Sequence, residues 1–319
     1  MFYLLESIYL TTRVRTYIMD VDPRLYSRGG IITERDPEKC IIRLRIAAGM
    51  TTPEQLIGIG KIARTYGDGR VHLTVRQTIE IPGVDPKRIV PMLTALKDIG
   101  TPLGSERQEI VNVTACMGTD HCKYANIDSL ALAKEIDTKF FGKEMPVKVR
   151  IAISACPNGC ASERLNEIGI TGVREPYRDH DACTGCGTCE KYCREKAIII
   201  KRGIVDLDKA RCMECGICVL PCPFEVLKAS EPRYRITIGG RRGRHPKIGR
   251  ELITVSSPEK VMEIVGKIIR WIYELASSDQ MLPEQLDEIG FDEFKRTIRE
   301  EYAEKRVWPP ENEVESDLL

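Results

Sequence analysis

The sequence of 319 residues lacks several features that would place it in a common class of protein. Positive and negative side chains nearly cancel, 48 against 47, so we expect no general nucleic-acid binding and only a local basic site. No apolar run approaches the roughly 18 residues that a membrane-spanning helix needs. The N-terminus has no basic start, continuous apolar core or small-residue cleavage site, as a signal peptide would. These absences predict a cytoplasmic protein without membrane insertion.

Motifs for nucleotide cofactors and for nucleophilic catalysis are missing too. No G-x-G-x-x-G follows an expected strand, and neither a phosphate-binding loop nor a Ser–His or Cys–His arrangement is visible. Cysteine, in contrast, is abundant: thirteen occur, and twelve fall into three tight groups. In a long chain without a secretory signal, this favours metal ligation in a reducing compartment over disulfides. Cys40 stands apart at the head of an expected strand and is interpreted as an ordinary buried residue.

The clearest helix signal in the first third of the chain lies at 51–66. Thr52 is the expected N-cap, Pro53 takes the first helical position and Gln55 completes a capping box. Alternating apolar residues predict strands on both sides of this helix, at 41–46 and as a short pair within 70–84.

Further helices are expected at 85–100 and 257–276. Pro91 predicts a break in the first of them, with the firm helix only from about Pro91 onward, because proline disrupts a helix interior. The second begins with Ser257 as N-cap and Pro258, and its apolar stripe faces the core. The remaining expected elements are a short helix within 126–140 and strands at 146–154 and from 234 onward. The chain therefore reads as an α+β protein.

Two cysteine runs share the spacing C-x2-C-x2-C-x3-C. They consist of Cys183, Cys186, Cys189 and Cys193, and of Cys212, Cys215, Cys218 and Cys222. This is the signature of bacterial two-cluster ferredoxins, in which the fourth cysteine of each run ligates the other cluster. One 4Fe–4S cluster is therefore expected on Cys183, Cys186, Cys189 and Cys222, and the other on Cys193, Cys212, Cys215 and Cys218.

Structural zinc is the alternative reading of these runs, since zinc also favours C-x2-C pairs. Two complete runs at ferredoxin spacing favour the clusters. The first run departs from the ferredoxin pattern only at Arg194, where a proline is usual. Two neighbouring clusters of this kind form a path for electrons, and such a path needs an end point.

A third group of cysteines is spaced differently, as C-x5-C followed later by C-x3-C. Its members are Cys116, Cys122, Cys156 and Cys160. With the surrounding stretches "NVTACMG" and "ISACPNGC", this pattern resembles the cluster motif of the siroheme-containing sulfite and nitrite reductases. "IIRLRIAAG" and "VHLTVRQTIEIPG" also resemble segments of that family. A ferredoxin domain inserted after C-x3-C is the layout of anaerobic and dissimilatory-type sulfite reductase subunits, and the similarity covers about residues 25–300.

The resemblance implies an α+β fold built from the family's two-lobed α/β repeat, with an inserted two-cluster ferredoxin domain. The parts that it implies are an N-terminal extension at 1–24, a ferredoxin-like half-domain at 25–100, a siroheme and 4Fe–4S domain at 101–175 and 231–319, and the insertion at 176–230. It also implies siroheme and three 4Fe–4S clusters as cofactors. Cys160 would bridge the third cluster to the siroheme iron, and Gly159 would let the backbone approach the macrocycle.

Siroheme carries eight carboxylates and sulfite is an anion, so the resemblance implies a cationic pocket. The family's substrate-binding arginine corresponds to Arg45, and its Lys-x-Lys pair corresponds to Lys148 and Arg150. Candidates for the siroheme carboxylates are Arg76, Arg241, Arg242 and Arg244. A solvated basic surface is the alternative reading of these four. One position departs from the family, because Val111 stands where many members have a sulfite-binding arginine.

The activity implied is the six-electron reduction of sulfite to sulfide, with electrons entering through the ferredoxin insertion. Nitrite reduction by the same fold and a non-catalytic electron-transfer subunit without siroheme are the alternatives. No nicotinamide site is visible, so a donor subunit or a soluble ferredoxin is expected as partner. Only one copy of the two-lobed repeat is present, which by analogy implies a homo-oligomer or hetero-oligomer.

Overall fold

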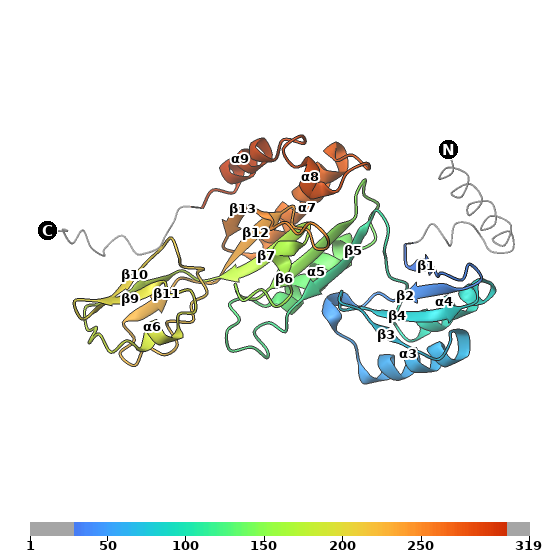
Figure 1. Ribbon diagram of the computed structural model, residues 1–319, viewed down its shortest axis with the longest axis horizontal. Coiled ribbons are helices and arrows are strands. Elements are labelled where there is room, and N and C mark those ends of the chain that lie inside the picture. Colours follow the sequence, from blue (N-terminus) through green and yellow to red (C-terminus); the bar gives the residue numbers. More distant parts are fainter. Residues whose placement is uncertain (1–28, 305–319) are drawn as a thin grey trace. The chain divides into compact units, whose positions relative to one another are not determined.

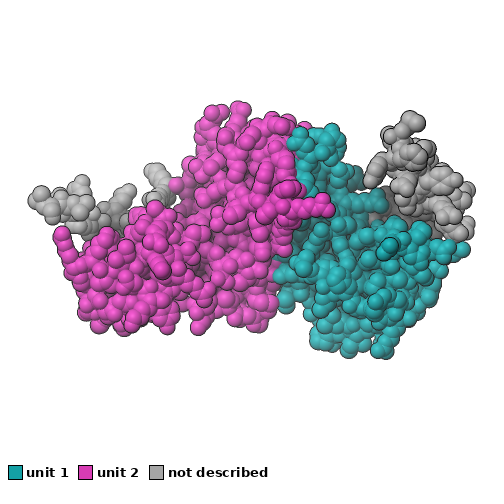
Figure 2. Space-filling model, in the orientation of Figure 1, with its two compact units in different colours: residues 1–114, 133–151, 277–281 teal, residues 115–132, 152–276, 282–319 magenta. Residues whose placement is uncertain are grey.

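The computed structural model describes residues 29–304 of the protein, and the predicted extension at 1–24 lies outside them. Two compact units make up the described chain (Figure 2). The first contains the residues up to 114, with 133–151 and 277–281, and the second contains 115–132, 152–276 and the residues from 282 onward. No helix within the described range has both the length and the apolar character needed to cross a membrane.

The first unit is built on a four-stranded antiparallel sheet in the order β1-β2-β4-β3 (Figure 1). Its strands are β1 (Ile31–Thr33), β2 (Cys40–Arg43), β3 (His72–Leu73) and β4 (Ile79–Val84). The helices α3 (Pro53–Tyr66) and α4 (Ile89–Asp98) follow β2 and β4, and short 3₁₀ turns lie at Ala47–Gly49 and Pro86–Arg88. Buried side chains of β2, β4, α3 and α4 form one apolar core.

Local sequence signals explain where these elements start. The predicted capping box is confirmed, because Gln55 N donates to Thr52 Oγ1 at 3.2 Å and Thr52 N donates to Gln55 Oε1 at 3.0 Å. The firm helix predicted from about Pro91 onward starts at Ile89 as α4, so the predicted break lies two residues too late in the sequence. Pro91 lies in the first turn, where a backbone N–H has no acceptor within the helix, and the break falls before Ile89.

The larger sheet has five strands in the order β13-β12-β7-β6-β5. They are β5 (Ile110–Ala115), β6 (Val149–Ser154), β7 (Ile168–Val173), β12 (Arg233–Ile238) and β13 (Arg250–Val255). β12 is antiparallel to both of its neighbours. The helices in this part of the sequence are α5 (Ser129–Phe140), α7 (Pro258–Leu275), α8 (Leu282–Gln285) and α9 (Phe291–Glu301), with a 3₁₀ turn at Glu163–Leu165.

Helix α7 begins as its sequence predicts. Ser257 is the N-cap and its hydroxyl accepts a hydrogen bond from Lys260 N at 3.4 Å, while Pro258 occupies the first position. The predicted apolar stripe is buried and consists of Val261, Ile264, Val265, Ile268 and Ile272. Burial of such a stripe contributes most of the stability of an amphipathic helix.

The predicted insertion consists of short elements and belongs to the second unit (Figure 1, yellow). Strand β8 (Pro176–Arg178) pairs with β11 (Leu227–Ala229), strand β9 (Ile198–Lys201) pairs with β10 (Ile204–Leu207), and α6 (Thr188–Tyr192) lies between β8 and β9 in the sequence. Cysteine side chains make up much of its small apolar core, beside Ile198, Val205, Val226 and Leu227. The insertion therefore depends on its cysteines for packing as well as for any ligation.

Candidate functional site

The irregular cysteine quartet lies in the second unit, next to the carboxyl ends of β5 and β6. Cys116 follows β5, and its sulfur accepts a hydrogen bond from Ala155 N at 3.1 Å. Cys156 follows Ala155, and burial raises the pKa of its thiol. The nearby thiols of Cys116, Cys122 and Cys160 raise that pKa further. The four sulfurs are thus close enough to act on one another electrostatically.

A buried carboxylate fixes the base of the loop that carries C-x3-C. Glu163 is 1% exposed, and it accepts hydrogen bonds from Thr171 Oγ1 at 2.9 Å and from Ser154 Oγ. Ser154 Oγ accepts a further hydrogen bond from Ala161 N at 3.2 Å. Because Ser154 precedes the loop and Ala161 follows it, this network holds the two ends together. Sequence reasoning missed Glu163, since the polar stretch "ASERLNE" carries no signal of burial.

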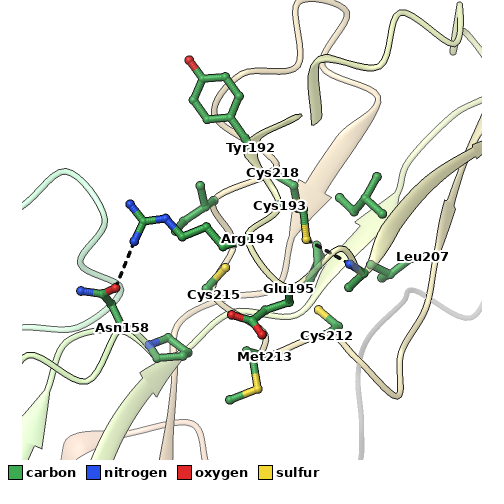
Figure 3. Close-up of a pocket in the computed structure, with 16 residues that line it drawn as sticks. Asn158, Tyr192, Cys193, Arg194, Glu195, Leu207, Cys212, Met213, Cys215 and Cys218 are labelled. Carbon is green, nitrogen blue, oxygen red and sulfur yellow. Dashed lines mark hydrogen bonds between the residues drawn. The ribbon is translucent and has the colours of Figure 1, made fainter. Parts of the chain in front are cut away.

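Two cavities lie in the insertion, and each is lined by four cysteines. We name them by whether residues of the C-x3-C loop line them, the near cavity having such residues and the far cavity having none. The far cavity is lined by Cys183, Cys186, Cys189 and Cys222. The near cavity, about 130 Å³ in volume, is lined by Cys193, Cys212, Cys215 and Cys218 (Figure 3). The fourth cysteine of each run thus lies with the first three of the other run, as ferredoxin spacing requires, although iron ligation itself stays a prediction.

The near-cavity thiols also influence one another. Burial, followed by the nearby thiols of Cys215, Cys212 and Cys193, raises the pKa of Cys218 to about 12. A thiol of this kind is protonated at neutral pH, so ligation to a metal has to displace its proton.

Hydrogen-bond donors point at sulfurs of all three quartets. Backbone N–H groups donate to Cys193 from Ala197 (3.3 Å), to Cys183 from Val205 (3.4 Å) and to Cys212 from Glu214 (3.4 Å), and the Asn158 amide donates to Cys160 (3.1 Å). Such donors stabilise thiolates and are among the groups that set the potential of a cluster. Within residues 29–304 no three His, Cys, Asp or Glu side chains have the geometry to hold a single metal ion. A 4Fe–4S cube takes one thiolate at each of its four iron corners, and the residues present fit it.

The near cavity borders the C-x3-C loop. Pro157 and Asn158 of that loop line the cavity together with its four cysteines. The backbone between Cys212 and Cys215 is also tied to the end of β7, because Arg174 N donates to Glu214 O at 2.7 Å. The order of thiols along the second unit is therefore far cavity, near cavity and C-x3-C loop.

A cluster of cations lies in the first unit around Glu106. Its carboxylate forms ion pairs with Arg43, Arg76 and Lys148, with an Nζ–Oε1 distance of 2.6 Å for the lysine. Arg43 Nε also donates to Glu80 Oε1 at 2.9 Å. Burial alone would raise the pKa of Glu80, but hydrogen bonds, that of Arg43 foremost, lower it. We call Arg43, Arg76, Lys148 and Glu106 the cation cluster.

Arg45, the predicted substrate-binding arginine, has other contacts in the first unit. Its Nε and Nη2 lie 2.9 and 2.6 Å from Asp137 Oδ2, and its guanidinium lies 4.4 Å from the ring centre of Phe141. Burial raises the pKa of Asp137 in spite of this arginine. The structure thus brings Arg76 and Lys148 together with Arg43, which sequence reasoning missed, while Arg45 pairs with Asp137.

The other predicted residues have separate positions. In the first unit, Arg150 lies half-buried on β6 and Val111 is fully buried on β5. In the second unit, Arg242 Nη2 donates to the carbonyl oxygen of Ala161 at 3.0 Å, next to Cys160, whereas Arg241 pairs with Glu284 of α8. Arg244 is exposed and Gly159 has a φ of +67°, which favours glycine. Of the three loop arginines, Arg242 contacts Ala161, the residue that directly follows the C-x3-C loop.

Thiols grouped in fours, with N–H groups directed at their sulfurs, define an iron–sulfur protein. Comparison with known proteins gives the family: the chain belongs to the one described as "Nitrite and sulphite reductase 4Fe-4S domain", which matches residues 106–307. Residues 32–99 match the "Nitrite/Sulfite reductase ferredoxin-like half domain". The predicted family is thereby confirmed.

Two relatives named as sulfite reductases are similar over most of this chain. It is 29% identical to the coenzyme F420-dependent sulfite reductase of Methanocaldococcus jannaschii, over 85% of this chain and 44% of that protein. It is 25% identical to one subunit of the anaerobic sulfite reductase of Salmonella typhimurium, over 82% of this chain and 83% of that protein. The chain thus spans less than half the length of the first relative and most of the second.

A solved structure supports the fold. The crystal structure of dissimilatory sulfite reductase I matches 88% of this chain and 72% of its own, with a TM-score of 0.67 and 19% sequence identity. Together with the match to the ferredoxin-like half domain, this likeness confirms the predicted α+β fold of the sulfite and nitrite reductases.

Proposed function

We propose that this chain is the catalytic subunit of a siroheme-dependent reductase that converts sulfite to sulfide. The observation that carries the proposal is the irregular quartet beside β5 and β6, with its C-x3-C loop bordering the near cavity. An electron-transfer protein without a terminal site would need only the two regular quartets. The names of the two sulfite reductase relatives support sulfite as the substrate.

Twelve of the thirteen cysteines form three sets of four, which would give three 4Fe–4S clusters. We assign one cluster to Cys116, Cys122, Cys156 and Cys160, and one to each of the two cavities in the insertion. Siroheme, held through Cys160, would supply an iron that binds the substrate sulfur and a macrocycle that takes part in electron transfer. Arg242, whose guanidinium reaches the residue after Cys160, is the best-supported partner for a siroheme carboxylate, and Arg241 and Arg244 are further candidates.

The order of thiols in the second unit supports electron entry at the insertion. The far cavity has no lining residue from the C-x3-C loop, whereas the near cavity has Pro157 and Asn158. We therefore assign the far cavity to the donor side and the near cavity to the catalytic side. A donor subunit or a soluble ferredoxin of the cytoplasm would dock beside the far cavity, and the enzyme would be a homo-oligomer or hetero-oligomer.

Cations of the first unit would neutralise the anions of the reaction. The cation cluster holds three positive side chains around one carboxylate, and Arg150 lies two positions from Lys148 on the sequence. Conversion of sulfite to sulfide and water consumes six electrons and six protons, so negative charge has to be balanced and protons delivered. Lys148 can donate a proton, and the arginines can bind an oxyanion in a forked geometry. Arg45 stays a candidate that would first have to leave Asp137.

A second candidate function follows from two features of the first unit, the carboxylate of Glu106 and the apolar residue Val111. Glu106 already neutralises part of the cation cluster, and Val111 is an apolar residue with no exposed surface. Both features would weaken binding of sulfite. They favour, as the alternative, an electron-transfer subunit without siroheme, while nitrite is the alternative substrate of a siroheme enzyme.

Turnover by the loaded enzyme tests the proposal. Protein purified without oxygen from a host that makes siroheme is supplied with reduced methyl viologen and either sulfite or nitrite. We expect one sulfide for every six electrons consumed with sulfite. Faster six-electron reduction of nitrite to ammonia would assign the alternative substrate. Absence of turnover with both anions in a siroheme-replete sample would contradict the proposal.

A further inference from the structure

The side chain of Asn158 links the C-x3-C loop to the insertion. Its Nδ2 donates to Cys160 Sγ at 3.1 Å. Its Oδ1 accepts a hydrogen bond from Arg194 Nη1 at 3.3 Å, which Figure 3 shows as a dashed line. Arg194 directly follows Cys193, a near-cavity thiol, and Asn158 lines the same cavity. One amide thus connects the near-cavity quartet with a thiol of the irregular quartet.

Arg194 determines which way the Asn158 amide faces. A guanidinium has only donors, so the amide must present its carbonyl oxygen to Arg194. The NH₂ group then faces the opposite side, where Cys160 Sγ lies. A side chain without a donor in place of Arg194 would leave the amide free to turn its oxygen toward the sulfur.

Arg194 is also the position at which the first cysteine run departs from the ferredoxin pattern, and this contact gives the departure a role. Ferredoxins usually have a proline after the fourth cysteine, and a proline here would offer no side-chain donor. With Arg194 at this position, the insertion reaches back to the C-x3-C loop.

We infer that Asn158 and Arg194 are positioning residues that raise the reduction potential of the cluster bound through Cys160. A hydrogen bond to a cysteine sulfur stabilises the reduced, more negative cluster relative to the oxidised one, so it favours reduction. The inference rests on the proposed function, because it requires a 4Fe–4S cluster on the irregular quartet. The pair makes this cluster a better acceptor for an electron held at the near cavity.

An EPR-monitored redox titration of the loaded enzyme tests the inference without measuring turnover. The signal of the cluster is identified by its loss in Cys116→Ser. In Asn158→Leu we expect the equilibrium constant for reduction of this cluster to fall about tenfold. This fall corresponds to a reduction potential lower by about 59 mV for a one-electron couple. Asn158→Asp keeps the size of the side chain and its contact with Arg194 but has no donor, so its potential should fall at least as far.

Arg194 variants separate positioning from charge. Arg194→Ala should lower the same potential, and adding it to Asn158→Leu should cause no further fall, because Arg194 acts through Asn158. Arg202→Ala removes an exposed positive charge of the insertion at the turn between β9 and β10, and it should leave the potential unchanged.

Two results would overturn the inference. One is an unchanged potential in both Asn158 variants, and the other is an equal fall in Arg194→Ala and Arg202→Ala. Iron and siroheme analysis of the unsubstituted protein tests the proposed function separately. If that protein has both cofactors but the potentials do not move, only this inference fails.

Discussion

The second unit gathers thiols and the first unit gathers cations, and the two kinds of group have different partners. In the second unit, the thiols receive hydrogen bonds from N–H groups, such as that of Ala155 to Cys116, and those bonds suit thiolates. In the first unit, cations are paired with the chain's own carboxylates, Glu106 in the cation cluster and Asp137 at Arg45. Cluster binding is therefore prepared by the fold, whereas an anion entering the cation cluster has to compete with Glu106.

The largest expected effect comes from the bridging thiol. Cys160→Ser should abolish the magnetic coupling between cluster and siroheme and reduce sulfite turnover to background, because serine does not replace the thiolate that joins them. EPR spectra and viologen-linked turnover measure the two effects. The matched control is Cys40→Ser in the first unit, which should retain both; full activity in Cys160→Ser would refute the assignment.

Next in size is the buried carboxylate that closes the C-x3-C loop. Glu163→Ala leaves the hydroxyls of Ser154 and Thr171 without their acceptor, which should cost about 1–3 kcal/mol in the free energy of unfolding. Denaturant unfolding measures the loss, and iron analysis should show less cluster on the irregular quartet. Glu288→Ala, an exposed substitution in the same unit, should do neither. Equal stability of the two variants would remove Glu163 from this role.

A substitution in the cation cluster should have a smaller effect, and it should improve anion binding where the two substitutions above cause losses. Glu106→Gln removes the competing charge and keeps an acceptor for Arg43, Arg76 and Lys148, so we expect anions to bind tighter by about tenfold, or about 1.4 kcal/mol. Optical titration of the oxidised enzyme with sulfite measures the dissociation constant. The exposed Glu38→Gln in the same unit is the control. Weaker binding in Glu106→Gln would mean that Glu106 holds the cations in place and does not compete with the anion.

The different nature of the two sites also explains what the sequence could predict. Cluster ligands follow one another at the short spacings of tight loops, so the sequence alone predicts three quartets from twelve cysteines. The structure places the two predicted ferredoxin quartets around separate cavities, and iron ligation stays a prediction. The cation cluster depends on side chains distant in sequence, Arg43, Arg76, Glu106 and Lys148, and no spacing connects them. Arg43 and Arg45 are two positions apart in the same predicted strand, so the sequence does not distinguish them. Only the tertiary contacts show that Arg43 pairs with Glu106 and Arg45 with Asp137.

Fold prediction divides in the same way. Caps are local, so Thr52 and Ser257 were assigned correctly as helix starts. The strand predicted at 41–46 ends at Arg43. Leu44 N still donates to Ile79 O of β4 at 2.8 Å, but the next residue changes partner, because Arg45 N donates to Pro102 O at 2.8 Å. Where a strand changes partner depends on distant chain segments, and periodicity alone does not contain that information.

The smallest effect is expected at the cysteine outside the quartets. Cys40 is 1% exposed, its thiol donates to Val84 O at 3.3 Å, and burial raises its pKa from 9.0 to about 12. Between pH 9 and pH 12 the Cys40 thiol keeps its proton in the folded protein but loses it in the unfolded chain. The contribution of Cys40 to the free energy of unfolding is therefore complete below pH 9 and is lost as the pH rises toward 12. The native protein should therefore resist alkylation at Cys40 by iodoacetamide at both pH 8 and pH 10. Ready alkylation at pH 10, detected by mass spectrometry, would contradict this placement.

The central claim is that the irregular quartet holds a cluster beside siroheme, and metal and pigment analysis tests it most directly. Protein is purified without oxygen from a host able to make siroheme, and its iron and extractable pigment are measured. Three 4Fe–4S clusters and siroheme predict about 13 iron atoms per chain and an extractable macrocycle. About 12 iron atoms and no macrocycle, in spite of the supplied cofactor, would contradict the claim and make the chain an electron-transfer subunit on a reductase fold.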